Sequence, residues 1–249
     1  MPALPSARPS DANAPLPVLP ALLRIRDLRF RWPRAASVCL ELSELDLAAG
    51  EALFLRGPSG CGKSTLLALA AGVLTAAPGA VALLGQDWAG LPASARDRRR
   101  ADHVGYIFQQ FNLLPYLSVL DNVLLPCRFS RQRRARAGQP RAAAQELLQR
   151  MSLGPQLWQQ PAAQLSVGQQ QRVAAARALI GGPELVIADE PTSALDEALR
   201  ESFMALLLQA CSAAGSALLF VSHDTRLATY FDRQVDLPAI NRAGAPVLV

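Results

Sequence analysis

Lysine is almost absent from this sequence. Of its 25 basic residues, 24 are arginine and only Lys63 is lysine. The two side chains are not interchangeable, because the lysine ammonium is a compact point charge whereas the arginine guanidinium is a planar fork. We therefore expect that the position of Lys63 requires lysine for a chemical reason.

Cysteine is also scarce, and its spacing excludes two classes of site. The four residues Cys39, Cys61, Cys127 and Cys211 are far apart, with no pair at the spacing of metal ligands or of a redox motif. We expect no disulfide and no zinc, and free thiols in a reduced intracellular protein.

Long hydrophobic runs are missing as well. The best candidate for a membrane span, residues 203–221, is interrupted by Gln209, Ser212, Gly215 and Ser216, which favours a helix, a turn and a buried strand. Residues 1–21 are rich in proline and alanine and predict a flexible tail. They lack the basic start and uninterrupted apolar core of a signal peptide.

What the chain has is enough apolar material for one large domain. It has 249 residues, 51% of them hydrophobic and 18% charged, with a net charge of +5. The positive excess lies largely in two arginine clusters, which we expect to be solvated surface, so nucleic acid is an unlikely partner. The clusters are Arg96, Arg98, Arg99 and Arg100, and Arg131, Arg133, Arg134 and Arg136.

The periodicity predicts strands that alternate with helices. Short apolar or alternating stretches between 22 and 55 indicate strands, among them residues 38–42. Helices are predicted at 64–71, 141–151, 167–180 and 197–211, and buried strands at 185–188 and 217–221. This order indicates an α/β domain over 22–249 with a mostly parallel sheet covered on both faces, and a helical subdomain inserted at about 111–164.

A phosphate-binding loop lies between a predicted strand and a predicted helix. The segment 57–64 fits the pattern GxxxxGK[ST] in the context that this motif requires. Its glycines let backbone N–H groups surround a phosphate at a helix N-terminus, Lys63 reaches the β- and γ-phosphates, and Ser64 is a ligand for Mg²⁺. The candidate nucleotide-binding residues are Gly57, Pro58, Ser59, Gly60, Cys61, Gly62, Lys63, Ser64 and Thr65.

Two carboxylates follow the apolar strand at 185–188. Open parallel sheets bind their ligands at this end of their strands, so we expect Asp189 and Glu190 to have two different roles in a ligand site. Asp189 would hold Mg²⁺, directly or through water. Glu190 would act as general base on the attacking water.

The segment 165–172, Leu-Ser-Val-Gly-Gln-Gln-Gln-Arg, resembles the signature sequence of ABC (ATP-binding cassette) ATPases. The order of the motifs from about 22 to 232 is also similar to that family. The resemblance implies a P-loop NTPase fold with a mostly parallel core sheet, an N-terminal antiparallel β subdomain and an inserted α-helical subdomain. It also implies an ATPase that uses ATP and Mg²⁺.

The same resemblance suggests roles for residues outside the phosphate loop. Gln109 matches the Q-loop glutamine, which senses Mg²⁺ and the attacking water, and His223 matches the H-loop histidine. Asp196 belongs to the D-loop. Trp32, with Phe30 as the alternative, resembles the aromatic residue that stacks on adenine, although an aromatic before a strand is often part of the core.

The signature residues are expected to serve a second subunit. In this family Ser166, Gly168 and Gln169 stand at a helix start whose N–H groups receive the γ-phosphate of ATP bound to the other subunit. Val167 departs from the family pattern, which commonly has glycine there. A β-branched residue disfavours positive φ, so we expect ordinary backbone angles at Val167.

The segment 105–123 is similar to ATPases of the lipoprotein-release and macrolide-export branch. The resemblance implies a separate integral-membrane permease docked near 111–136, at the cytoplasmic face of the inner (plasma) membrane. It also implies a second ABC ATPase subunit, identical or different. The alternative is a soluble ABC ATPase that acts on DNA or ribosomes, but the chain has no tandem cassette and no sustained heptad pattern.

Overall fold

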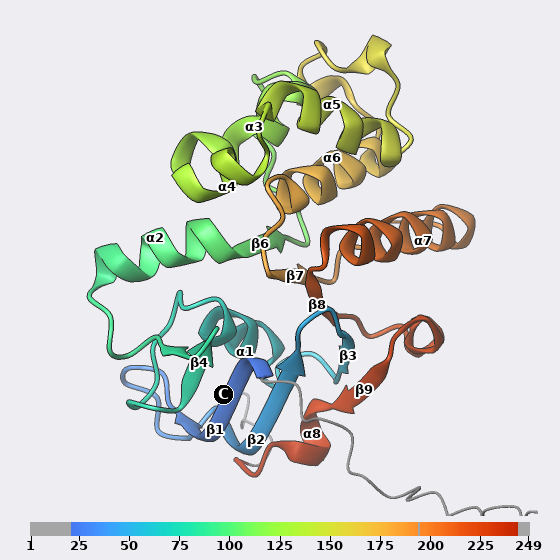
Figure 1. The fold of residues 1–249 in the computed structure, drawn as a ribbon. Helices are drawn as coiled ribbons and strands as arrows, with labels where there is room; N and C mark the ends of the chain where they lie inside the picture. The colour runs from blue at the N-terminus through green and yellow to red at the C-terminus, as the bar shows by residue number, and fades with distance from the viewer. Residues whose placement is uncertain (1–20, 194, 244–249) are drawn as a thin grey trace, which may run out of the picture.

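Two β-sheets and surrounding helices make up the fold, seen in a computed structural model (Figure 1). The structure describes residues 21–193 and 195–243. Its strands are β1 (Ala21–Phe30), β2 (Leu40–Ala48), β3 (Ala52–Arg56), β4 (Val81–Leu83), β5 (Gln86–Asp87), β6 (Val104–Ile107), β7 (Leu185–Asp189), β8 (Ala217–Val221) and β9 (Arg233–Asp236). Its α-helices are α1 (Lys63–Ala70), α2 (Ala93–His103), α3 (Val119–Phe129), α4 (Arg131–Arg136), α5 (Pro140–Arg150), α6 (Val167–Leu179), α7 (Glu197–Ala214) and α8 (Leu237–Ile240). Short 3₁₀ helices are η1 (Pro155–Leu157), η2 (Ala162–Gln164) and η3 (Thr225–Tyr230).

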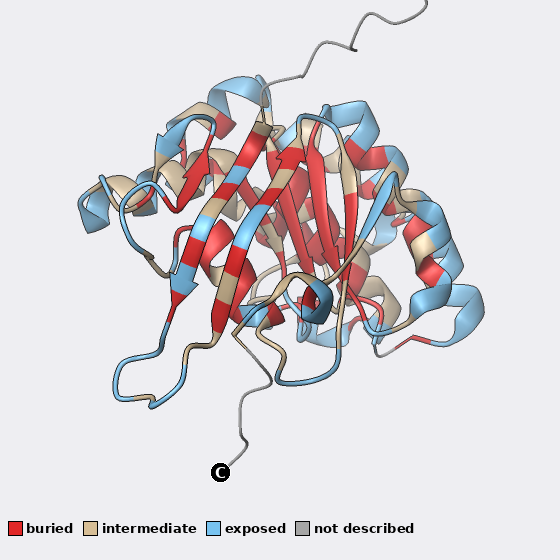
Figure 2. Cartoon of the chain, turned by 90° about the horizontal axis from the view of Figure 1, so that it is seen from below, coloured by how far each residue is buried: buried red, intermediate tan, exposed pale blue. Residues whose placement is uncertain are grey.

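The central sheet is parallel and buried on both faces. Its strand order is β6-β7-β8-β3-β9, and every paired neighbour runs in the same direction. Successive side chains of a strand point to opposite faces, so Leu185 and Ile187 enter one hydrophobic cluster while Val186 and Ala188 enter the other. Figure 2 shows these strands as the buried centre of the molecule. Burial on both faces explains why β7 and β8 read as continuous apolar runs.

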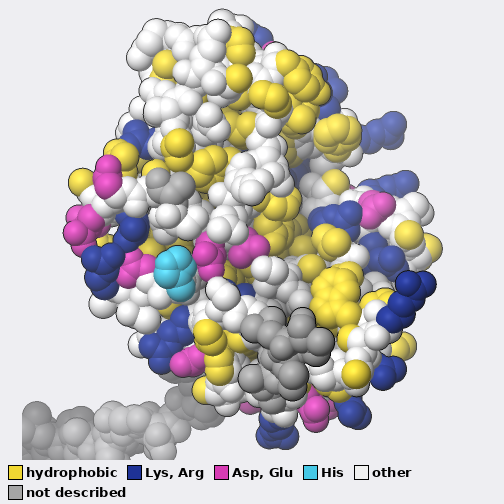
Figure 3. Space-filling model, turned by 180° about the vertical axis from the view of Figure 1, so that it is seen from behind, with side chains coloured by type: hydrophobic (Ala, Val, Ile, Leu, Met, Phe, Trp, Pro, Cys, Tyr) yellow, Lys and Arg dark blue, Asp and Glu magenta, His cyan; other side chains and the backbone are white. Residues whose placement is uncertain are grey.

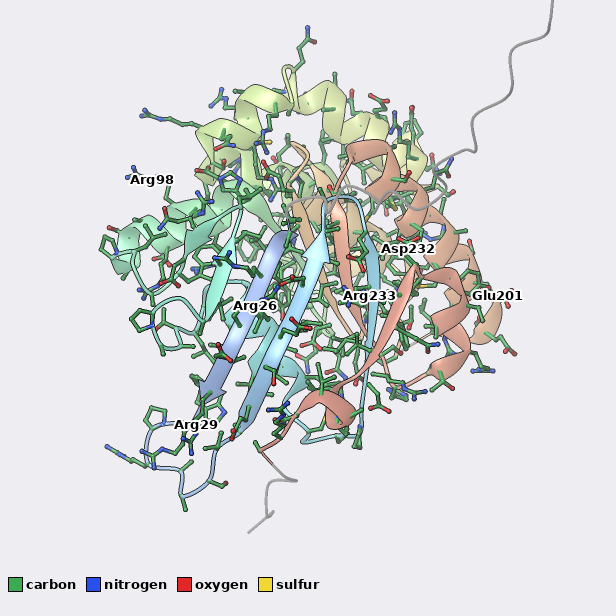
Figure 4. All side chains as sticks on the ribbon, turned by 60° about the horizontal axis from the view of Figure 1, so that its bottom comes forward. Arg26, Arg29, Arg98, Glu201, Asp232 and Arg233 are labelled. Atoms are coloured by element: carbon green, nitrogen blue, oxygen red, sulfur yellow. The ribbon has the colours of Figure 1, made fainter. Side chains whose placement is uncertain are left out.

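An antiparallel sheet with the order β2-β1-β4-β5 lies beside α1. Leu66 and Leu67 of α1 join the cluster that contains the inner residues of β1, β2 and the parallel sheet, so α1 is covered on more than one side. On the outer face of this sheet, Arg26 of β1 forms an ion pair with Asp46 of β2 (Figure 4). The antiparallel pairing of these strands confirms the predicted N-terminal antiparallel β subdomain.

The helices α3, α4 and α5 form the upper layer in Figure 1, and α6 lies between them and the sheet. Ser118 begins α3 by accepting a hydrogen bond from the Asp121 N–H. The packed face of this layer includes Val123, Leu148 and Val173. The helices α3, α4 and α5 lie within 111–164, where we predicted an inserted helical region.

The prediction of elements was right for the long apolar patterns and incomplete elsewhere. The helices predicted at 141–151, 167–180 and 197–211 are α5, α6 and α7, with ends shifted by up to three residues. The strand predicted at 38–42 is wrong in its bounds, because the paired strand is β2. The sequence also did not predict α2, which has no buried residue and therefore no apolar stripe to mark it.

One member of the second arginine cluster, Arg133, is not the solvated surface residue that we predicted, whereas Arg131, Arg134 and Arg136 are exposed. The side chain of Arg133 is only 2% exposed, and its guanidinium donates to backbone carbonyls at the end of α6. Arg98 and Arg134 are exposed as expected, and Figure 4 shows Arg98 pointing away from α2. A long side chain reached the interior because unpaired carbonyls at a helix C-terminus attract a cation.

The predicted tail at 1–21 falls outside the described residues, except for Ala21, which begins β1. Among the described residues, no helix has both the length and the apolar character to cross a bilayer.

Candidate functional site

The loop 57–62 joins the buried strand β3 to α1. The N-cap residue Gly62 has φ 102°, which is in the left-handed region that glycine adopts without strain. Within the part of the chain that the structure describes, no side chain caps α1, and its first turn contains no acidic residue. The first N–H groups of α1 and its dipole are therefore available to an anion.

The single lysine is held inside this loop. Lys63 is 8% exposed, and its ammonium donates to the carbonyl oxygens of Gly57 at 2.8 Å and Pro58 at 3.0 Å. Its Nζ also lies 3.9 Å from Oε1 of Glu190. The positive charge thus sits between the phosphate loop and the acidic end of β7.

Asp189 ends β7 close to Ser64 of α1. Burial raises the pKa of the Asp189 carboxyl and the neighbouring charge of Glu190 raises it further, whereas Lys63 and a hydrogen bond with the Ser64 side chain oppose the shift. The fold therefore brings together two oxygen ligands that the sequence predicted for Mg²⁺. A cation at this point would relieve the repulsion between the two acids.

Glu190 has an unusual backbone. Its φ of 44° is left-handed, which costs a residue with a side chain about 1–3 kcal/mol and persists only where the surroundings fix it. The Glu190 N–H donates to Val221 O at 3.0 Å, and Oε2 lies 3.2 Å from Nδ1 of His223. The acid and the histidine, predicted separately from β7 and β8, therefore meet at one edge of the sheet.

Lys63, Asp189 and Glu190 line one cavity of about 570 Å³, whereas His223 lies outside its lining. Trp32 is 44% exposed in its wall, and Phe30 packs edge-on behind Trp32 as an 8% exposed core residue, so the geometry favours Trp32 over Phe30. The sequence did not point to Ala35, Ser37 or Cys39 as part of this wall, because they belong to no motif. The full lining is Trp32, Ala35, Ser37, Cys39, Ser59, Gly60, Gly62, Lys63, Ser64, Thr65, Gln109, Asp189 and Glu190.

The segment 166–169 lies outside that cavity, at the exposed start of α6. Ser166 and Gln169 form a capping box: the Ser166 hydroxyl accepts from the Gln169 N–H at 3.3 Å, and the Gln169 side chain accepts from the Ser166 N–H at 3.0 Å. Val167 is the first helical residue and is 48% exposed. Its backbone is helical, as predicted, so valine does not distort the start of α6.

A second, polar cavity of about 450 Å³ adjoins His223. Arg200 of α7 donates to Leu195 O at 3.0 Å and forms an ion pair with Asp224, which follows the histidine. Hydrogen bonds from Arg226, followed by the charges of both arginines, lower the pKa of Asp224 to about 2. Asp196 begins α7 by accepting from the Leu199 N–H at 2.9 Å.

A family model described as ABC transporter matches residues 40–193. This chain belongs to the ABC transporter family. It is 44% identical over 194 residues to "Lipoprotein-releasing system ATP-binding protein LolD 2" of Caulobacter vibrioides, covering 78% of this chain and 83% of that protein. It is 39% identical over 218 residues to "Macrolide export ATP-binding/permease protein MacB" of Shigella flexneri, covering 87% of this chain and 33% of that protein.

Solved structures agree with this assignment. The dimeric, post-hydrolysis structure of the ATP-binding cassette MJ0796 with ADP and Pi superimposes with a TM-score of 0.73 at 32% identity, covering 86% of this ABC chain and 93% of that one. The predicted family, its lipoprotein-release and macrolide-export branch, and the P-loop fold are confirmed. The protein is an ATPase and an ATP-binding subunit of an ABC transporter, and the alternative of an ATPase that acts on DNA or ribosomes is not favoured.

Proposed function

We propose that this ABC ATPase binds ATP with Mg²⁺ between the phosphate loop and the end of β7. The observation that carries the proposal is that Lys63, Ser64, Asp189 and Glu190 line one cavity together with Trp32. The triphosphate would lie at the start of α1, where N–H groups and Lys63 face it. Adenine would stack on Trp32.

The residues present fit Mg²⁺. This ion prefers oxygen ligands and is usually held by one or two carboxylates together with substrate phosphates. Ser64, Asp189 and the amide oxygen of Gln109 offer oxygen ligands in one cavity, and burial together with the charge of Glu190 raises the pKa of the Asp189 carboxyl, a shift that a bound cation would oppose. Within residues 21–193 and 195–243 there is no metal cluster made of His, Cys, Asp and Glu alone, so phosphate oxygens would complete the coordination. When bound, Mg²⁺ would neutralise charge that develops on the phosphates.

Glu190 would act as general base in hydrolysis. Its carboxyl is 19% exposed, so it can polarise a water molecule in the cavity, and His223 at 3.2 Å can orient the carboxylate and the γ-phosphate. Lys63 would exchange its bonds to Gly57 and Pro58 for bonds to phosphate oxygens. Gln109, exposed between β6 and α3, would report the state of the site to the helical layer.

Two subunits would share each ATP. Ser166, Gly168 and Gln169 are not among the residues that line the cavity of Lys63, and they stand at the N-terminus of α6. Such a terminus binds anions, so it would complete the site of a second subunit. Asp196 would lie at the same contact. The second subunit is either a copy of this chain or another ABC ATPase.

A separate membrane permease would dock in a groove beside the helical layer. This groove has a volume of about 590 Å³ and is lined by α2, α3 and α4, with exposed Phe108 and Phe129 among its apolar side chains. Arginine side chains flank a hollow at the right-hand edge of the face in Figure 3, since the single lysine of the chain is buried in the phosphate loop. MacB carries "ATP-binding/permease" in its name and is three times as long as the match, which supports a permease as the natural partner.

We further propose lipoprotein release or macrolide-type export as the process, on the cytoplasmic face of the inner membrane. The names of LolD 2 and MacB support this process. Residues 22–249 would form one ATP-binding domain, in which the subdomain at about 111–164 transmits closure and opening to the permease.

The test is Mg²⁺-dependent ATP hydrolysis by the purified chain over a range of protein concentrations, together with Glu190→Gln. The wild-type rate per subunit should rise with concentration because two subunits complete each site. Glu190→Gln should lower kcat about 100-fold or more, the range of general acid–base catalysis, and should form an ATP-dependent dimer. Glu201→Gln, on the exposed side of α7 in Figure 4, is the matched control and should behave as wild type.

Two results would contradict the proposal. A Glu190→Gln variant that hydrolyses ATP at the wild-type rate would remove Glu190 from the role of base. A rate per subunit that is constant at every concentration, with only monomer present, would remove the shared site.

A further inference from the structure

Gln171 is the only fully buried glutamine of the described chain. It lies one turn after the start of α6, with an exposed fraction of 0%. Its Nε2 donates to the carbonyl oxygen of Pro191 at 2.7 Å, in the turn that follows β7. A buried amide in a core that is otherwise apolar needs such a partner, and its removal leaves the carbonyl without one.

The neighbouring glutamines do different work. Gln169 closes the capping box with Ser166, and Gln170 donates to Leu165 O at 3.0 Å, so both serve the local structure around the start of α6. Gln171 alone of the three crosses to another element. The sequence did not single it out, because three adjacent glutamines look alike until their directions are known.

The bond from Gln171 reaches the residue next to Glu190. Pro191 is buried and directly follows Glu190. The left-handed φ of 44° at Glu190 aims the Glu190 carboxyl at Lys63 and His223. Two other bonds fix this turn, from the Glu190 N–H to Val221 O and from the Ser193 N–H to Glu190 O. These two hydrogen bonds use only backbone groups of β8 and of the turn. The Gln171 side chain therefore adds a constraint on the turn that comes from α6.

We propose that Gln171 is a positioning residue that holds the Glu190 turn in its left-handed conformation and ties the direction of the Glu190 carboxyl to α6. The inference rests on the proposed role of Glu190 as base. Since α6 begins with the segment 166–169, a contact that a second subunit makes there reaches Glu190 of the same chain through one helical turn and one hydrogen bond.

The test is Gln171→Met, which keeps the length of the side chain and removes the donor. A misplaced base costs rate rather than binding, so kcat should fall about 10- to 100-fold while KM for ATP stays within about twofold. Gln170→Met removes a similar amide from the same helix and is the control, with kcat within about twofold of wild type. Thermal unfolding of each variant shows whether the folded fraction is unchanged at the assay temperature.

A second readout separates positioning from a general loss of structure. In a Glu190→Gln background, Gln171→Met should leave the ATP concentration needed for dimer formation unchanged, because the group that it positions is already gone. Weaker dimer formation in that background would show a structural role and overturn the inference.

The outcomes for the two proposals are distinct. If Glu190→Gln abolishes hydrolysis while Gln171→Met keeps the wild-type kcat, only the role of Gln171 falls. If Glu190→Gln itself keeps the wild-type kcat, the proposed base is wrong, and the inference about Gln171 falls with it.

Discussion

A methyl group at Gly62 would lie 2.7 Å from Cδ2 of Leu40. The backbone at Gly62 is also left-handed, so a side chain there meets both a steric and a conformational cost. Because Gly62 begins the helix that faces the predicted phosphate, the cost falls directly on the nucleotide site.

Gly62→Ala should therefore weaken both the fold and ATP binding. We expect a loss of about 1–3 kcal/mol in the free energy of unfolding, the usual cost of a strained left-handed residue. Gly85→Ala is the matched control, since Gly85 has a positive φ but no atom within 4 Å of the added carbon. Denaturant unfolding and titration with a fluorescent ATP analogue measure the two effects. Equal losses of ATP affinity in both variants would contradict the steric argument at Gly62.

Arg133 should be the most costly arginine of its cluster to replace. Burial lowers its pKa to about 10, so it is still charged at neutral pH, and its guanidinium donates to Ile180 O at 2.7 Å. Arg133→Met leaves carbonyls at the end of α6 unpaired and should cost about 2–4 kcal/mol. The exposed neighbour in Arg134→Met should change stability by less than about 0.5 kcal/mol. Equal denaturant midpoints for the two variants would show that the buried contacts contribute nothing.

Asp224 should stabilise the fold only where it is ionised. Its pKa is lowered to about 2 in the folded chain, below the value of about 4 in an unfolded chain, so its contribution is present above pH 4 and is lost as the pH falls toward 2. The free energy of unfolding of wild type should exceed that of Asp224→Asn by about 1 kcal/mol between pH 5 and 8, as measured by denaturant unfolding. This difference in stability should shrink as the pH falls from 4 to 2.

The matched control for this pH profile is Asp97→Asn. Asp97 pairs with Arg100 on the surface of α2, and its side chain is 67% exposed. The loss of unfolding free energy in Asp97→Asn should be smaller than the loss in Asp224→Asn at every pH. A difference between wild type and Asp224→Asn that grows on acidification would reverse the predicted sign.

The site was predictable where a local pattern carries the chemistry. The loop 57–64 must form before a helix whatever surrounds it, because its glycines and its lysine are sequence neighbours. In the same way Asp189 and Glu190 follow a run of apolar residues that only a buried strand explains. Period-2 burial then assigns each residue of β7 to one of the two hydrophobic clusters.

The burial and direction of polar side chains could not be predicted from the sequence, because no apolar periodicity marks them. Nothing local distinguishes Arg133, which is buried, from Arg134, which is exposed, since burial depends on carbonyls 45 and 47 residues away. The same holds for Gln171 among its neighbours. The β-strand that we predicted at 38–42 has different bounds because its register is set by pairing with β1.

The sequence by itself determined the phosphate loop, the acidic strand end, the signature segment and the parallel α/β class, because each is encoded in residues that are adjacent or periodic. Only the tertiary structure decided that Glu190 faces both Lys63 and His223, that Trp32 rather than Phe30 enters the cavity, and that Gln171 crosses to Pro191. The physical reason is that these relations join segments far apart in the chain, and their directions depend on strand order and on a left-handed backbone at Glu190 that no local propensity favours.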